Sequence, residues 1–174
     1  TAQLKGDVDV DTLLSAPYFV SPLRKHDCPP ISDGASAIVL TTREIAEKKC
    51  KRPAYIRGID HRIEPHHLGT RDLTQYPSTN LAGEKAGVHN GPVDVAELYA
   101  PFSHQEIILK NALKLDDSVP INPSGGVLAG NIFMSSGLSR IGEVADRIIN
   151  GVVNRGIAHA TSGPCLQQNM VIVL

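Results

Sequence analysis

The sequence has no tryptophan, and aromatic residues make up only 4% of its 174 positions. It also lacks any apolar run near the roughly 18 residues that a membrane-spanning helix needs, which excludes an integral membrane protein of that kind. Lysine and arginine number 17 against 18 aspartates and glutamates, so the formal net charge is −1. This balance offers no sequence-wide attraction for nucleic acid. The remaining composition, 41% hydrophobic and 20% charged, is typical of a soluble globular domain with a sizeable core.

Cysteine is scarce as well. Cys28, Cys50 and Cys165 are too few and too widely spaced for a disulfide framework, a zinc knuckle or a redox motif. We therefore expect a reducing, cytoplasmic setting. The histidines between His61 and His67 lack nearby cysteine and helical spacing, so an exposed loop is expected and a metal site is not. The chain begins without methionine and ends on an apolar segment, which predicts a piece of a longer protein.

Short apolar runs alternate with helical patterns along the chain. Ala35–Leu40 has the length and composition of a buried strand, and so does Val93–Tyr99. Further strands are predicted at Ala158–Thr161 and Asn169–Leu174, and Arg52–Ile63 is expected to be extended. Strands that alternate with helices favour a layered α/β fold whose sheet is covered on both faces.

Helices are predicted between these strands. Ser78–Ala86 is expected to stop at the glycine that follows it. Ser103 and Glu106 have the spacing of a capping box that opens the next helix. Apolar residues then recur every three or four positions over Leu138–Val152, which is the strongest helical pattern in the sequence. Functional groups in such folds collect at strand ends and helix starts, so these are the places to search for a site.

Small residues are concentrated in Asn122–Asn131, shortly before this strongest helix. Glycines allow the backbone to approach a ligand closely, and their amides can bind an oxygen that gains charge in a transition state. We therefore expect Ser124, Gly125 and Gly126 to contact substrate. A purely structural loop is the alternative, because the segment matches no dinucleotide or phosphate-binding fingerprint.

Three segments, in order, resemble the C-terminal half of thiolases of the acetyl-CoA acetyltransferase type, particularly the branch of sterol-carrier-protein thiolases and actinobacterial lipid-transfer-type proteins. Asp27–Ala37 is similar to the family's entry into its C-terminal domain. Val95–Ser103 stands where the family carries a His-Asp-Cys-Phe or Asn-Glu-Ala-Phe motif, and Asn122–Gly130 resembles the approach to its Gly-His-Pro motif. The resemblance implies a layered α-β-α domain with a mixed central sheet over residues 31–174, preceded by a linker over residues 1–30.

The chain departs from the family at positions that carry chemistry. Tyr99 stands in place of the histidine or asparagine of the first motif, Pro101 in place of a cysteine, and Asn131 in place of the histidine of Gly-His-Pro. An asparagine donates hydrogen bonds but cannot accept and return a proton near neutral pH. The phenol of Tyr99 is a good donor, and it could transfer a proton if its surroundings lower its pKa; a plain core residue is the alternative. Ungapped counting from the C-terminal strand places Thr161 at the family's second cysteine, and Cys165 follows four residues later.

The resemblance implies an enzyme that acts on acyl-CoA thioesters, by acyl transfer or carbon–carbon bond cleavage, in lipid or steroid side-chain metabolism. We expect Tyr99, Asn131 and Cys165 to be catalytic, and Phe102 and His159 to join the substrate site. Retro-aldol cleavage of a β-hydroxyacyl-CoA using Tyr99 is one alternative, and a noncatalytic acyl-CoA-binding or lipid-transfer module is another. Coenzyme A enters as part of the substrate, and no cofactor or metal is expected.

The same resemblance implies partners. The family's nucleophilic cysteine lies in an N-terminal half, so the complete protein is expected to supply that half and this segment alone to be inactive. An isolated half would expose an apolar face, which favours a homodimer or a higher assembly. A small OB-fold acyl-CoA-binding protein is a further possible partner. Nucleic acid and membrane are not expected partners.

Overall fold

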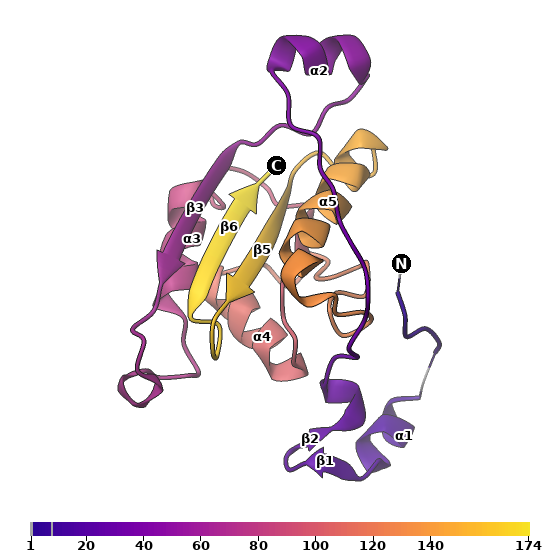
Figure 1. The fold of residues 1–174 in the computed structure, drawn as a ribbon, viewed down its shortest axis with the longest axis vertical. Coiled ribbons are helices and arrows are strands. Elements are labelled where there is room, and N and C mark those ends of the chain that lie inside the picture. Colours follow the sequence, from indigo (N-terminus) through magenta and orange to yellow (C-terminus); the bar gives the residue numbers. More distant parts are fainter. Residues whose placement is uncertain (1, 8) are drawn as a thin grey trace.

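The centre of the computed structural model, which describes residues 2–7 and 9–174, is a four-stranded sheet in the order β3-β6-β5-β4 (Figure 1). β6 is antiparallel to both β3 and β5, whereas β4 and β5 are parallel, so the sheet is mixed as expected. The strands β3, β4, β5 and β6 span Gly58–Ile63, Val95–Glu97, Gly156–Ser162 and Gln168–Val173.

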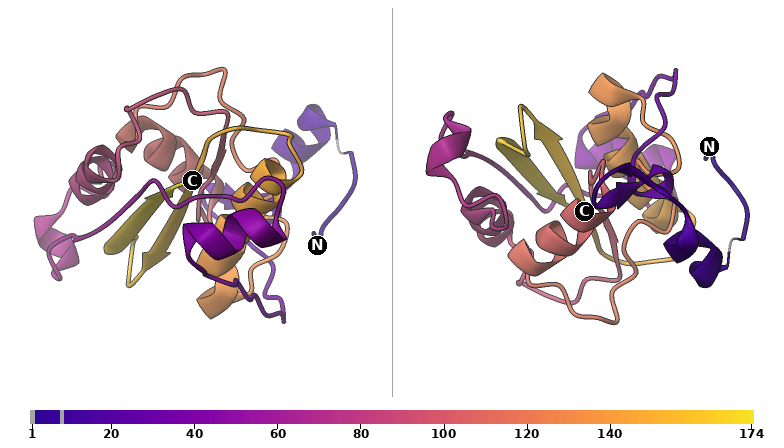
Figure 2. Two further views of the ribbon diagram at one scale, coloured as in Figure 1. Left: turned by 90° about the horizontal axis from the view of Figure 1, so that it is seen from above. Right: turned by 90° about the horizontal axis from the view of Figure 1, so that it is seen from below.

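Helices cover both faces of this sheet, which confirms the α-β-α layering (Figure 2). α3 (Pro77–Ala86) and α4 (Ser103–Ala112) pack on one face, and α5 (Ser136–Ile149) packs on the other. Successive residues of β5 enter opposite clusters: Ile157 packs toward α3 and α4, whereas Ala158 packs toward α5. This alternation is the two-residue period of a strand that is buried on both sides.

Local sequence explains where α3 begins and ends and which face of α5 is buried. Pro77 occupies the first turn of α3, where its missing amide hydrogen costs no helical bond. The same helix ends at Gly87, whose φ of 83° is the left-handed conformation that glycine adopts easily. The apolar stripe predicted for α5 is present, with Val144 and Ile148 buried against the sheet.

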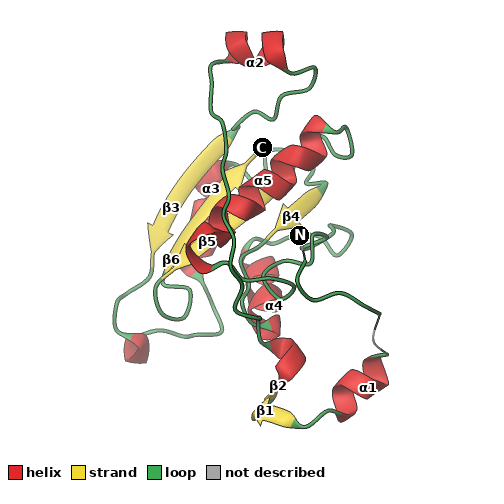
Figure 3. Cartoon of the chain, turned by 45° about the vertical axis from the view of Figure 1, so that its right-hand side comes forward, coloured by secondary structure: helices red, strands yellow, loops and turns green. Residues whose placement is uncertain are grey.

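Two small units project from the layered core (Figure 3). Residues 10–27, expected to belong to a linker, carry short elements: α1 (Val10–Ser15), β1 (Tyr18–Val20), β2 (Leu23–Arg24) and a 3-10 turn at Lys25–Asp27. α2 (Arg43–Lys49) lies at the opposite end of the molecule. Further single 3-10 turns are formed by Leu68–Thr70 and Phe133–Ser135.

The strand predicted at Ala35–Leu40 is wrong for the chain as it folds. The segment is irregular, and Val39 and Leu40 are 92% and 75% exposed. A strand requires a neighbouring backbone for its hydrogen bonds. In the sheet of the described residues, this segment pairs with none of β3, β6, β5 and β4.

The capping box predicted for α4 between Ser103 and Glu106 is also wrong, because both side chains bond to other residues. The first cap is Phe102, whose amide donates to the side-chain oxygen of Gln105 at 3.2 Å. The Ser103 hydroxyl instead donates to Asp27 at 2.7 Å, and the Glu106 carboxylate accepts from Asn122 at 2.6 Å. Long-range hydrogen bonds therefore replace the local ones that the sequence pattern predicted.

His159 on β5 is fully buried between the sheet and α3. Its Nε2 lies 3.0 Å from the side-chain oxygen of Asn169, and Asn169 donates in turn to the Ser78 hydroxyl at 2.8 Å. The other ring nitrogen, Nδ1, is buried without a hydrogen-bond partner among the described residues. Burial lowers the pKa of His159 to about 4, so the ring is neutral at neutral pH.

None of the helices in the described part of the chain combines the length and apolarity needed to cross a membrane.

A clash predicts the cost of filling one glycine. A Cβ at Gly156 would lie 2.6 Å from Val144 and 2.7 Å from Val95 side-chain carbons. Gly156→Ala should therefore lower the free energy of unfolding by about 1–3 kcal/mol in urea titrations. Gly142→Ala in α5, where a Cβ meets nothing within 4 Å, should raise it by about 0.5–1 kcal/mol. Equal stability of Gly156→Ala and the parent would contradict the packing described.

The pKa of His159 predicts acid sensitivity. Because the folded-state pKa lies below the ordinary value of 6.5, the unfolded chain binds the extra proton first. The stabilisation is complete above pH 6.5 and is lost as the pH falls toward 4, by about 3 kcal/mol in all. His159→Gln should flatten the pH dependence of urea unfolding, whereas His61→Gln, at an exposed histidine, should leave it steep. A steep profile in His159→Gln would show that another group controls it.

Candidate functional site

The candidate site lies at the sheet edge where β4 and β5 end. Because these strands are parallel, their carboxyl ends meet there. Tyr99 follows β4 by two residues, and the turn that carries Cys165 joins β5 to β6 at the same edge. The Asn122–Asn131 loop reaches the same edge next to β4, because Ile121, the residue just before the loop, pairs with Ala96 of β4 in a parallel bridge.

The side chains of Tyr99 and Asn131 meet at this edge. The Tyr99 hydroxyl donates to the Asn131 side-chain oxygen at 3.2 Å. The same oxygen accepts hydrogen bonds from the Phe133 amide at 3.2 Å and from the Ser136 hydroxyl at 3.2 Å. A backbone N–H can only donate, so the Asn131 oxygen faces these groups and its NH₂ faces away. The arrangement leaves the Asn131 NH₂ with no hydrogen-bond acceptor among the described residues.

The phenol of Tyr99 is half-buried. Burial raises its pKa above the ordinary value of 10.0, against the lowering effect of the contact with Asn131. The environment therefore acts in the direction opposite to the one that proton abstraction by Tyr99 would require. Near neutral pH the phenol is protonated and serves as a hydrogen-bond donor.

A buried ion pair lies beneath the glycine-rich loop. Glu97 at the end of β4 is 0% exposed and lies 2.7 Å from Nη1 of Arg140 in α5. Burial raises the pKa of Glu97, while Ser124 and Arg140 stabilise its ionised form. Ser124 completes the network: its hydroxyl donates to Glu97 at 2.7 Å and accepts from Arg140 at 2.7 Å, and its amide donates to Glu97 at 3.1 Å.

The amides of the two glycines that follow are used inside the loop. Gly125 and Gly126 have φ angles of 94° and 58°, which side chains with a Cβ rarely adopt. The Gly125 amide donates to the Asn122 carbonyl at 2.8 Å, and the Gly126 amide donates to the Ser124 hydroxyl at 3.2 Å. These glycines shape the loop, and their amides do not point to an oxyanion.

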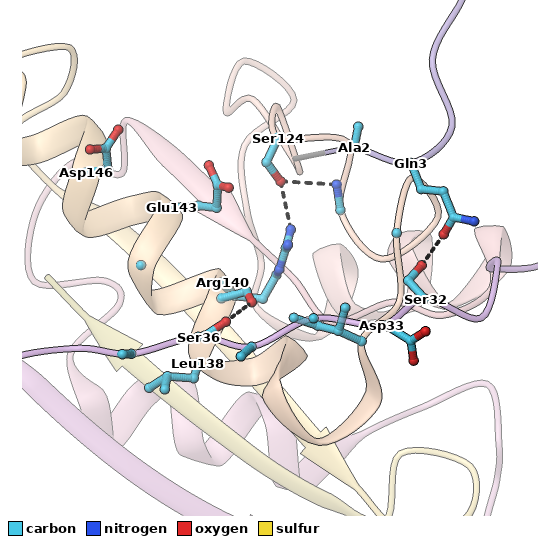
Figure 4. Close-up of a pocket in the computed structure, with 18 of the residues that line it drawn as sticks. Ala2, Gln3, Ser32, Asp33, Ser36, Ser124, Leu138, Arg140, Glu143 and Asp146 are labelled. Carbon is cyan, nitrogen blue, oxygen red and sulfur yellow. Dashed lines mark hydrogen bonds between the residues drawn. The ribbon is translucent and has the colours of Figure 1, made fainter.

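A cavity of about 720 Å³ lies beside this loop, between the extended segment 31–38 and α5 (Figure 4). Arg140 and Ser124 meet at its inner wall, and Glu143 and Asp146 line it farther along the helix. Gly130 and Ile132, on either side of Asn131, also line it, but Asn131 and Tyr99 do not. The polar pair and the cavity are therefore neighbours with separate linings.

The extended segment 31–38, which lines the cavity, also holds the backbone of Asn131 through Ser32. The Ser32 amide donates to the Asn131 carbonyl at 3.0 Å, and the Asn131 amide donates to the Ser32 hydroxyl at 3.1 Å. With only 4% of its surface exposed, Asn131 is thus fixed through both its backbone and its side chain.

The other predicted site residues are dispersed. Cys165 is exposed and free, and the carbonyl of its residue accepts a hydrogen bond from Arg71. Within residues 2–7 and 9–174, no hydrogen bond joins Cys165 to Tyr99 or Asn131. Phe102 is half-buried at the start of α4. Fully buried His159 lies on the α3 side of the sheet and has no surface to offer a ligand.

Sequence reasoning missed Glu97, Arg140 and Ser136. The first two left a signal, because each interrupts an apolar pattern: Glu97 in a buried strand, and Arg140 one turn before Val144 on the buried stripe of α5. Two opposite charges at buried positions predict each other as partners. Ser136 left no comparable signal. No group of three or more histidine, cysteine, aspartate or glutamate residues in the described chain could hold a metal ion.

Comparisons with known proteins agree with this architecture, although no protein-family model matches the chain. It is 27% identical over 185 residues to an acetyl-CoA acetyltransferase of Methanothermobacter thermautotrophicus, covering 93% of this chain and 48% of the relative. It is 25% identical over 199 residues to the benzoylsuccinyl-CoA thiolase subunit BbsB of Thauera aromatica, covering 97% and 52%. The chain thus spans about half the length of these curated relatives.

A solved structure shares the fold. The Ltp2-ChsH2(DUF35) aldolase matches with a TM-score of 0.72 and 19% identity, over 95% of this chain and 51% of that one. In sequence and in fold, the chain is thiolase-like.

Proposed function

We propose that the complete protein acts on acyl-CoA thioesters and makes or breaks a carbon–carbon bond next to the thioester carbonyl. The observation that carries the proposal is the Tyr99–Asn131 contact at the end of β4, with the Asn131 NH₂ left for a ligand. The names of the thiolase relatives support coenzyme A thioesters as the substrate class. Lipid or steroid side-chain metabolism remains a proposal that the residue chemistry does not address.

The chemistry follows from what the pair can donate. Bond making or breaking next to a thioester places negative charge on the carbonyl oxygen as an enolate forms. Fixed donors that bind this oxygen more strongly in the transition state than in the ground state lower the barrier. The Asn131 NH₂ supplies one such donor, and the single hydrogen of protonated Tyr99 either orients that amide or, where a substrate oxygen replaces the Asn131 oxygen as its acceptor, supplies a second.

Retro-aldol cleavage is the second candidate. In that reaction a base removes the β-hydroxyl proton, the bond between the α and β carbons breaks, and a carbonyl compound leaves with a thioester enolate. Tyr99 stands where the resemblance places a histidine or asparagine, and Asn131 where it places the histidine that serves thiolysis; neither is a base near neutral pH, so the base of an aldol cleavage would come from another group. The aldolase that shares the fold supports this candidate.

A binding module without turnover is the competing hypothesis, and one experiment separates the three. The complete protein is incubated with a panel of acyl-CoA, β-ketoacyl-CoA and β-hydroxyacyl-CoA thioesters, and binding and products are measured. Thiolysis or condensation favours acyl transfer, and release of a carbonyl compound favours the aldolase. Affinity without any product would favour the binding module, and no calorimetric binding of any thioester would end all three.

Tyr99 gives the proposal its direct test. Tyr99→Phe removes one oxygen and keeps the ring, so turnover by the complete protein should fall on the order of 10²- to 10⁴-fold. The melting temperature should move by only a few degrees, because the ring packing is unchanged. Tyr55→Phe is the matched control, since that hydroxyl bonds Glu47 at an exposed position and turnover should not change. Turnover of Tyr99→Phe within about threefold of the parent would remove this hydroxyl from the mechanism.

The remaining half of the protein is the proposed partner of one apolar face. Val39 and Leu40, adjacent in the chain, are 92% and 75% exposed. Small residues, namely Gly34, Ala35, Ala37 and Gly142, form part of the lining of the neighbouring cavity, alongside the charged side chains of Arg140, Glu143 and Asp146. Small residues allow close approach of another backbone, so we propose that the other half fills this cavity and that acyl-CoA does not. Dimerisation and an OB-fold partner are proposed with it; the name of the aldolase that shares the fold includes a second component, ChsH2(DUF35).

The exposed segment predicts the behaviour of this chain by itself. Residues 1–174 alone should self-associate as concentration rises, because the apolar face seeks cover. Val39→Lys should weaken the association, whereas Ile107→Lys, at a 64% exposed position on α4, should not. Light scattering across a concentration series measures both. A parent chain that stays monomeric at high concentration would count against this interface.

A further inference from the structure

We infer that Ser136, the first residue of α5, is a positioning residue that turns the Asn131 amide so that its NH₂ faces the substrate. The inference rests on the proposed function, because it gives that NH₂ a substrate oxygen to bind. Ser136 itself is 1% exposed and so offers almost no surface to a ligand. Its effect must therefore pass through Asn131.

The hydroxyl of Ser136 has its two roles fixed by its neighbours. It accepts a hydrogen bond from the Ile132 amide at 3.1 Å, and a backbone amide can only donate. The hydroxyl proton is therefore left for the side-chain oxygen of Asn131, 3.2 Å away. The Ser136 hydroxyl is thus a donor at the face where the Asn131 oxygen lies.

Three donors together select one of the two orientations of the amide. A flip of Asn131 would place its NH₂ against the Phe133 amide, so a donor would face a donor, and the Ser136 hydroxyl would lose the acceptor of its proton. In the orientation present, no described residue accepts from the Asn131 NH₂, and the group is not enclosed among buried unpartnered atoms. Apart from Tyr99, two groups donate to the Asn131 oxygen: the Phe133 amide and the Ser136 hydroxyl. Removing the Ser136 hydroxyl leaves only the first, so the preference for the present orientation of the amide weakens.

A double-mutant cycle in the complete protein tests this coupling. Ser136→Ala should lower kcat about tenfold with KM within about twofold, because the donor acts on charge that develops in the transition state. In an Asn131→Ala background, the same change should lower kcat less than about twofold, since no amide remains to orient. A structural defect unrelated to Asn131 would lower kcat by the same factor in both backgrounds. That result would overturn the inference.

Two further variants keep the test sharp. Ser136→Thr retains the hydroxyl and should keep kcat within about threefold of the parent; activity as low as that of Ser136→Ala would overturn the inference. Ser135→Ala removes a neighbouring hydroxyl that only reaches the Ile132 carbonyl at 3.5 Å, and it should match the parent. If the parent protein binds no CoA thioester, the proposed function fails. If the parent turns over substrate and Ser136→Ala equals it, only the inference fails.

Discussion

The ion pair between Glu97 and Arg140 is the constraint on which the arrangement of this edge depends. It joins the end of β4 to the second turn of α5 at 2.7 Å with both side chains buried. Burying two charges is expensive, and leaving one of them unpaired costs about 3–5 kcal/mol. The pair therefore contributes less to net stability than to selecting one arrangement of α5 against β4. Other arrangements would leave a buried charge without its partner. Ser124, bonded to both partners, brings the glycine-rich loop into the same arrangement.

The geometry of the Tyr99–Asn131 pair depends on this ion pair. Tyr99 lies two residues beyond Glu97, so a fixed β4 fixes the start of its side chain. Ser136 lies one helical turn before Arg140 and holds the Asn131 oxygen, so a fixed α5 fixes the orientation of that amide. The two glycines follow Ser124 in the loop that leads to Asn131, and their amides bond to Asn122 and Ser124 within that loop. A site on rigid elements holds its donors more accurately than a site on a free loop.

The local sequence pattern predicted the structure where buried positions recur along one helix or strand. It failed where residues distant in the sequence determine the structure. The stripe of α5 and the alternation of β5 could be read directly, because each reflects one element facing the sheet. The capping pattern at Ser103 and Glu106 lost to contacts with Asp27 and Asn122, which are distant in sequence. The strand expected at Ala35–Leu40 has the right residues, but strand formation also requires a partner that this segment lacks. Tyr99 and Asn131 could be named from the resemblance and expected as donors, whereas the hydrogen bond between them and the orientation of the Asn131 amide could not.

The chemistry of the pair itself indicates what another part of the protein must supply. Protonated Tyr99, the neutral amide of Asn131 and the already bonded hydroxyl of Ser136 are all donors toward an oxygen. Carbon–carbon bond cleavage or formation also requires a group that accepts a proton, and none of these three can do so near neutral pH. His159 would titrate in a useful range if it were exposed, but burial keeps it neutral and away from ligand. Under the proposed function, the proton acceptor is therefore sought in two places: at free Cys165, on the turn at the same sheet edge, and in the part of the protein proposed to cover the Val39 face.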